Sequence, residues 1–180
     1  MGKSLLAAAA TVIAAAVLIL SVRVLGPSSA AFAFVVVWAP MAWLGTVSRL
    51  FQPRLPGQFH ELRDFERDPR LYERVGVRFV KRLLRRGPLA AFNPRLHLPA
   101  ERSSERLAEL EQAMNDAEAS HFILLVATLG VVINAAVRGW WLAAGLTLLF
   151  NLLMNGCPVM LQRYNRVLLH ARFSRQRASV

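Results

Sequence analysis

The stretch ASHFILLVATLGVVINAAV (Ala119–Val137) and, after one arginine, the stretch GWWLAAGLTLLFNLLMNGCPVMLQ (Gly139–Gln162) contain no charged residue and decide the fold. Two further uncharged stretches, Ser4–Val22 and Val24–Ser48, lie near the N-terminus. A helix needs roughly 20 apolar residues to cross the hydrocarbon core of a bilayer. The sequence therefore predicts an all-α membrane protein with four transmembrane helices in one membrane domain, residues 1–180. We expect the spans at about residues 4–25, 29–50, 120–137 and 139–161.

The charge distribution predicts how these spans are oriented. The chain is 55% hydrophobic and carries a net charge of +11. All 11 acidic residues lie between Glu61 and Glu118, and the tail at residues 163–180 is basic. Because loops rich in Lys and Arg stay in the cytoplasm, we expect the N-terminus, segment 52–118 and the tail inside the cell. This predicts a multi-pass protein of the cell membrane with both termini cytoplasmic. We interpret the basic excess as contact with anionic membrane lipid, and not with nucleic acid.

The first uncharged stretch has a second interpretation. Met1–Lys3 followed by an Ala/Leu run is also compatible with a signal peptide, cleaved near Ala31–Ala33. Cleavage there would cut into the second hydrophobic stretch, so we favour a retained span.

Segment 52–118, between spans two and three, is predicted to be a helical segment at the membrane interface. Asp68 is a suitable N-cap, and proline is favoured at the first helical position, so a helix is expected over Pro69–Arg86. Its basic residues fall on one face: Arg70, Arg74, Arg78, Lys81, Arg82 and Arg85. The rest is apolar, as expected for a helix that lies in the interface. Glu73 sits on the apolar side and needs either a salt bridge to another segment or a function. After an extended link (Ala91–Arg102), a second helix is expected to begin at Ser103 or Ser104 and to continue into the third span.

Glu118 and His121 lie three residues apart, which makes them neighbours on a helix. Such a carboxylate can orient the imidazole while the second ring nitrogen accepts a proton from a substrate hydroxyl, as a general base does. The same spacing also fits a structural ion pair. With Glu111 on the same face, a metal site remains a third interpretation.

Polar residues also form a stripe along the fourth span, where Asn151, Asn155, Gln162 and Arg166 share one face. Such residues usually face the interior of a helix bundle, where they can join helices by hydrogen bonds. Pro158 is expected to bend this helix below Asn155. The run from Gln162 to Arg166 is unusually rich in hydrogen-bonding side chains for the end of a span.

The chain resembles a known family at these positions. The matching motifs are Tyr72-Glu73-x-x-Gly76-Val77 with Lys81, Ala117-Glu118-x-x-His121, and Asn155-x-x-Pro158 leading into Gln162-Arg163-Tyr164-Asn165-Arg166. They are similar to the glycosyl-4,4′-diaponeurosporenoate acyltransferases of staphyloxanthin-type carotenoid synthesis. The resemblance implies transfer of a fatty acyl group to the sugar of a glycosylated carotenoid or similar glycolipid. Separately, we expect no cofactor and no bound metal. The expected partners are membrane lipid and a lipid-soluble glycoside.

A mechanism follows as a hypothesis, with acyl-CoA as the donor. The basic stripe would bind its phosphates, His121 oriented by Glu118 would deprotonate the acceptor, and Arg166, Gln162 or Asn165 would stabilise the oxyanion. We therefore expect catalytic roles for His121, Glu118 and Arg166. Substrate-binding roles are expected for Glu73, Arg74, Arg78, Lys81, Asn155, Gln162, Arg163, Tyr164 and Asn165. The alternative is a membrane scaffold or accessory subunit without enzymatic activity.

Overall fold

Helices account for all the regular secondary structure that is described. The computed structural model describes residues 2–48, 54–86 and 104–177, and these ranges contain no strand. Four helices are long and apolar enough to cross a membrane: Gly2–Leu25, Ala30–Val47, Glu105–Val137 and Trp141–Ala171. The predicted all-α fold with four membrane-length helices is therefore confirmed. The end of the second predicted span and the link Ala91–Arg102 lie outside the described residues.

The chain divides into two compact units. The first consists of residues 1–54 and 119–158, and the second of residues 55–118 and 159–180. Helices α6 (Ser104–Val137) and α8 (Cys157–Arg177) contribute residues to both. The start of α6 at Ser104 and its continuous course into the apolar stretch confirm the prediction for this helix.

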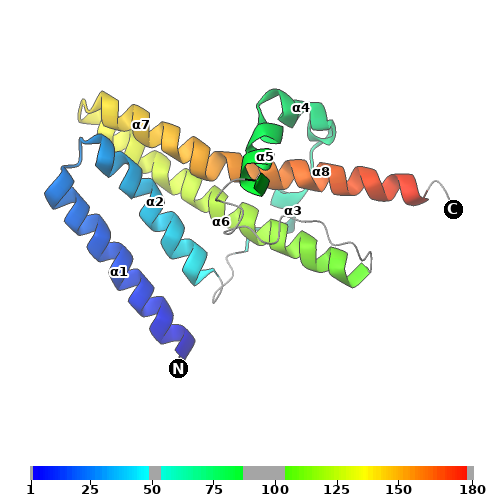
Figure 1. Ribbon diagram of the computed structural model, residues 1–180, viewed down its shortest axis with the longest axis horizontal. Coiled ribbons are helices and arrows are strands. Elements are labelled where there is room, and N and C mark those ends of the chain that lie inside the picture. The colour runs from blue at the N-terminus through cyan, green and yellow to red at the C-terminus, as the bar shows by residue number, and fades with distance from the viewer. Residues whose placement is uncertain (1, 49–53, 87–103, 178–180) are drawn as a thin grey trace. The chain divides into compact units, whose positions relative to one another are not determined.

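The first unit contains α1 (Gly2–Leu25) and α2 (Ala30–Val47), which are joined by a tight turn (Figure 1). Gly26 adopts a φ of 76°, which favours glycine, and the Ser29 hydroxyl caps α2 by accepting from the Phe32 N–H. Trp43 Nε1 donates to Thr11 Oγ1 across the two helices at 2.9 Å. The α2 helix also packs against α7 (Trp141–Asn151).

The last span is not a uniform α-helix. Between α7 and α8, residues Leu152–Gly156 form a π-turn, in which the Cys157 N–H donates to the Leu152 carbonyl five residues earlier. Pro158 follows immediately and has no N–H to donate to a preceding carbonyl. The irregularity thus lies next to the proline at which we expected the helix to be perturbed. A π-turn is often found at functional positions.

The second unit begins with short helices: α3 (Gly57–His60), a 3₁₀ turn (Asp64–Arg67), α4 (Pro69–Arg74) and α5 (Val77–Arg86). The prediction of one helix over Pro69–Arg86 was wrong, because the helix is interrupted between Arg74 and Val77, around Gly76. Gly76 has a φ of 83°, and its N–H donates to the Glu73 carbonyl. The Asp68 side chain caps α4 as predicted, by accepting from the Arg70 N–H.

The core of the second unit lies between α4, α5 and α8. It contains Tyr72, Val77, Leu161, Tyr164 and Val167. The break at Gly76 allows Tyr72 and Val77 to join the same cluster from two separate helices.

Candidate functional site

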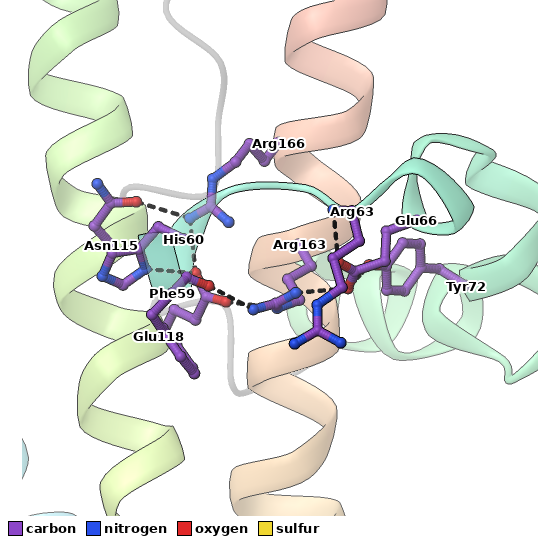
Figure 2. Close-up of polar contacts among 9 residues, drawn as sticks. All are labelled: Phe59, His60, Arg63, Glu66, Tyr72, Asn115, Glu118, Arg163 and Arg166. Carbon is purple, nitrogen blue, oxygen red and sulfur yellow. Dashed lines mark hydrogen bonds and ion pairs between the residues drawn. The ribbon is translucent and has the colours of Figure 1, made fainter. Parts of the chain in front are cut away.

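Glu118 is the centre of a network of charges in the second unit (Figure 2). Its side chain is fully buried, yet both carboxylate oxygens are satisfied. Oε1 accepts from Arg163 Nε at 2.7 Å, and Oε2 accepts from Arg166 Nη2 at 2.7 Å. The His60 Nδ1 atom lies 2.9 Å from the same Oε2. A buried carboxylate is stable only with such partners.

Arg163 joins Glu118 to a second buried carboxylate. Its Nη1 atom donates to Glu66 Oε1 at 2.6 Å, and its Nη2 atom donates to the Phe59 carbonyl at 2.7 Å. Together with its Nε contact to Glu118, this uses all three nitrogens of the guanidinium. We call His60, Glu66, Glu118, Arg163 and Arg166 the ion cluster. Its two glutamates and two arginines balance in charge.

Glu66 is held as a carboxylate by its neighbours. Burial by itself raises the pKa of Glu66, but hydrogen bonds from the Arg63 N–H, from Arg163 and from the Tyr72 hydroxyl outweigh it, and the net pKa lies below the ordinary value. The pKa of Tyr72 is raised, by burial and by its hydrogen bond to Glu66. The Tyr72 hydroxyl therefore stays protonated and serves as a donor.

Arg166 carries two donors that no residue in the described ranges uses. Its side chain is 2% exposed. The Nη2 atom donates to both Asn115 and Glu118 at 2.7 Å, whereas Nε and Nη1 are buried without a hydrogen-bond partner. Buried N–H groups are nearly always paired, so two unpaired nitrogens on one buried guanidinium need an explanation.

A second set of contacts joins α4 and α5 to α8, next to the hydrophobic core. The Tyr164 hydroxyl donates to Glu73 Oε1 at 3.1 Å, and Lys81 Nζ donates to Asn165 Oδ1 at 2.7 Å. Arg78 Nη1 lies 3.5 Å from Glu73. Glu73 thus has the partners that its place on the apolar side required.

In the first unit, two residues of the predicted polar stripe, Asn151 and Asn155, form a chain of hydrogen bonds. Asn151 Nδ2 donates to the Leu125 carbonyl at 2.9 Å, and Asn155 Nδ2 donates to Asn151 Oδ1 at 2.8 Å. The chain continues to His121, whose Nδ1 atom lies 3.2 Å from Asn155 Oδ1. Both asparagines are fully buried.

The structure thus places the residues predicted for one site in several local arrangements. Glu118 and Arg166 belong to the ion cluster, and the hydrogen-bond partner of His121 is Asn155. Each of Glu118 and His121 therefore has partners other than the one their spacing suggested. Arg74 is exposed on α4, and Gln162 is half-buried on α8. Within the described ranges, no group of three or more His, Cys, Asp or Glu residues is arranged to hold a metal ion.

Sequence reasoning missed three residues that complete the ion cluster and its contacts: His60, Glu66 and Asn115. Glu66 lies three residues after Arg63 and accepts from that backbone N–H at 3.0 Å, but arginine is not a preferred N-cap residue, so only half of a capping signal was present in the sequence. His60 and Asn115 had no such signal. His60 reaches a partner 58 residues away, and Asn115 one that is 51 residues away.

Comparison with known proteins identifies the family. No curated protein and no solved structure matches the chain. The family model described as glycosyl-4,4′-diaponeurosporenoate acyltransferase matches residues 56–175, a region that includes α3 to α7 and most of α8. The matched region contains every member of the ion cluster and the His121–Asn155 contact. The chain therefore belongs to the glycosyl-4,4′-diaponeurosporenoate acyltransferase family.

Proposed function

We propose that this protein is a membrane-bound acyltransferase that moves a fatty acyl group from a thioester donor such as acyl-CoA to a sugar hydroxyl of a lipid-soluble glycoside. A glycosylated carotenoid acid is the acceptor that the family description suggests. In the reaction, the hydroxyl oxygen forms an ester bond to the acyl carbon and the C–S bond of the donor breaks. The hydroxyl proton leaves with the thiolate, by way of a general base.

The observation that carries the proposal is the pair of unused donors on Arg166. Acyl transfer passes through a tetrahedral intermediate with a negatively charged oxygen, and preorganised donors in a dry site stabilise that charge. Arg166 Nε and Nη1 are buried and unpaired, while Nη2 is held by Asn115 and Glu118. The contacts at Nη2 fix the guanidinium, and in this proposal one of the two unpaired nitrogens donates to the oxyanion. In this proposal, Glu118 and Asn115 position Arg166 and do not contact the substrate.

Two groups of exposed residues on α4, on α5 and in the short break between them support contact with a membrane surface and an anionic donor. Leu71, Val75 and Phe79 expose apolar side chains, with Phe79 67% exposed. Arg74 and Arg78 are exposed as well, with Arg78 beside Glu73, and in this proposal they bind the donor phosphates. We propose that α4 and α5 lie in the cytoplasmic interface, with both chain termini in the cytoplasm of the cell. Reporter fusions at Val180 and at Gly139 should report opposite sides of the membrane, and the same side for both would refute this orientation.

A scaffold or accessory subunit is the second candidate, and two observations favour it. Glu66 and Glu118 are both paired with Arg163, as expected for contacts whose role is structural. In addition, a cavity of about 560 Å³ in the first unit is lined by other residues, among them Phe32 and Val131. This candidate leaves the two unpaired nitrogens of Arg166 without a role.

The test is acyl transfer by the purified protein in nanodiscs, with acyl-CoA and a glycosylated carotenoid acid, followed by mass spectrometry of the product. Loss of an oxyanion donor commonly lowers kcat about 10²–10³-fold. We expect a loss of that order in Arg166→Lys, because lysine keeps the charge beside Glu118 but lacks the planar fork of donors. The matched control is Arg67→Lys, since Arg67 is 71% exposed and pairs with Asp64. No product from the wild-type protein, or full kcat in Arg166→Lys, would refute the proposal in favour of the scaffold.

A further inference from the structure

We infer that Asn151 and Asn155 select the His121 tautomer that carries its proton on Nδ1, so that Nε2 of the uncharged ring is the acceptor for a hydroxyl group of a ligand. The ligand class is an alcohol, and its identification with the acceptor glycoside rests on the proposed function. The argument depends on the direction of each hydrogen bond in the chain from Leu125 to His121.

The Leu125 carbonyl sets the direction at one end. A backbone carbonyl can only accept, so Asn151 must present its amide nitrogen there, as the 2.9 Å contact shows. The amide oxygen of Asn151 is then turned the other way. It accepts from Asn155 Nδ2 at 2.8 Å.

The same reasoning carries on to the histidine. Because Asn155 uses its nitrogen toward Asn151, its oxygen faces His121 Nδ1 at 3.2 Å. An amide oxygen cannot donate, so Nδ1 must carry the hydrogen. The hydrogen bond made by one ring nitrogen decides the protonation of the other, and Nε2 of the neutral ring is left with a lone pair.

Burial makes this direction hard to reverse. Asn151 and Asn155 are both fully buried. Rotating the Asn151 amide by half a turn would bring its oxygen against the Leu125 carbonyl oxygen and leave two buried acceptors facing each other. The two asparagines are therefore positioning residues that act through His121. A general base for acyl transfer needs a lone pair on one ring nitrogen, and the tautomer selected by these hydrogen bonds places that lone pair on Nε2.

A purely structural role makes a different prediction. Hydrogen bonds between membrane helices stabilise their packing, and Asn151 does join α7 to α6. If the role is only structural, removing either asparagine should lower the stability of the protein but should leave the tautomer of His121 unchanged. The tautomer is therefore the property to measure.

The test is ¹⁵N NMR of histidine-labelled full-length protein in nanodiscs, with the His121 signal assigned by its loss in His121→Phe. We expect the wild-type ring to carry its proton on Nδ1. Asn155→Leu removes the oxygen that accepts from His121 Nδ1. Asn151→Ala does not alter any group in contact with the ring, but it removes the partner that fixes the orientation of the Asn155 amide. In both variants the ratio of the Nδ1–H tautomer to the Nε2–H tautomer should fall by about threefold to tenfold. This range corresponds to the loss of one hydrogen bond.

Thr128→Val is the matched control, because Thr128 is a buried polar residue on the same helix as His121 and outside the chain of hydrogen bonds. It should leave the tautomer unchanged. A wild-type ring with its proton on Nε2, or an unchanged tautomer in both asparagine variants, would overturn the inference.

Acyl transfer measured on the same samples separates this inference from the proposed function. Asn155→Leu and Asn151→Ala should lower kcat by about the same factor as the tautomer population, with KM unchanged. If the wild-type protein has the expected tautomer but forms no acylated product, the proposed function fails and the assignment of the acceptor nitrogen stands. If product forms and the ring has the other tautomer, the inference fails and the proposed function stands.

Discussion

Replacing Glu118 by glutamine should destabilise the second unit strongly, because it removes one charge from a balanced buried set. The carboxylate contacts two guanidinium groups at 2.7 Å each, and Arg166 is only 2% exposed. A neutral side-chain amide at this position cannot compensate both of them, so one buried positive charge is left without a partner of opposite sign. Breaking a buried ion pair in this way costs about 3–5 kcal/mol.

This free energy corresponds to a measurable shift in the melting temperature. For chains of 150–250 residues, 1 kcal/mol shifts Tm by roughly 2–4 °C, so Glu118→Gln should melt about 6–20 °C below the wild type. The assay is thermal unfolding in detergent, followed by circular dichroism. The matched control is Glu109→Gln on the same helix, because Glu109 is 64% exposed and lies 3.8 Å from Arg106. An exposed pair stabilises by about 0–1 kcal/mol, which predicts a shift below about 4 °C.

A double variant sharpens the test. Glu118→Leu and Arg166→Leu should each be destabilising alone, whereas the double variant restores the balance of charge. We expect it to be less destabilised than the sum of the single variants, by about 0.5–3 kcal/mol, as coupled neighbours are. The reasoning is refuted if Glu118→Gln shifts Tm no more than Glu109→Gln does, or if the two leucine substitutions are additive.

Two further predictions concern the second unit. Gly76→Ala should lower the free energy of unfolding by about 1–2 kcal/mol, because a φ of 83° is strained for alanine, although an added Cβ would meet nothing within 4 Å. The measurement is thermal unfolding. The control is Gly145→Ala, because Gly145 is a helical glycine that also has open space and its replacement should not destabilise the protein. The lowered pKa of Glu66 predicts stability that is present above its unfolded value of 4.5 and is lost as the pH falls through the folded value. A plot of Tm against pH should therefore fall less steeply below pH 4.5 in Glu66→Gln than in the wild type, and parallel curves would contradict this assignment.

Features that depend on local sequence were predictable. The length of the uncharged stretches predicted the four long helices, Asp68 predicted the start of α4, and Ser103 or Ser104 predicted the start of the helix that continues into the third span. The prediction of a single helix over Pro69–Arg86 was wrong because of one residue, Gly76. Glycine is tolerated within helices at a modest cost, so the pattern alone did not distinguish a helical Gly76 from one with a positive φ.

The candidate site was predictable only in part, because its contacts join distant segments. The four-residue spacing placed Asn151 and Asn155 on one face, and they do form a hydrogen bond. The direction of that bond depends on the Leu125 carbonyl, 26 residues from Asn151, which no spacing reveals. In the same way, Glu118 is paired with Arg163, 45 residues away, although His121, three residues away, was the partner that the spacing predicted.

The long separation between these partners also affects the order in which the protein can assemble during synthesis. Glu66 and Glu118 leave the ribosome before either of their arginines exists, and the α7 helix and its π-turn must be made in between. At about 5–20 residues per second, the 45 residues from Glu118 to Arg163 take about 2–9 s. During this interval the two carboxylates have to remain hydrated. The ion cluster can therefore close only after the first part of α8 has been made, and until then its two glutamates lack their arginine partners.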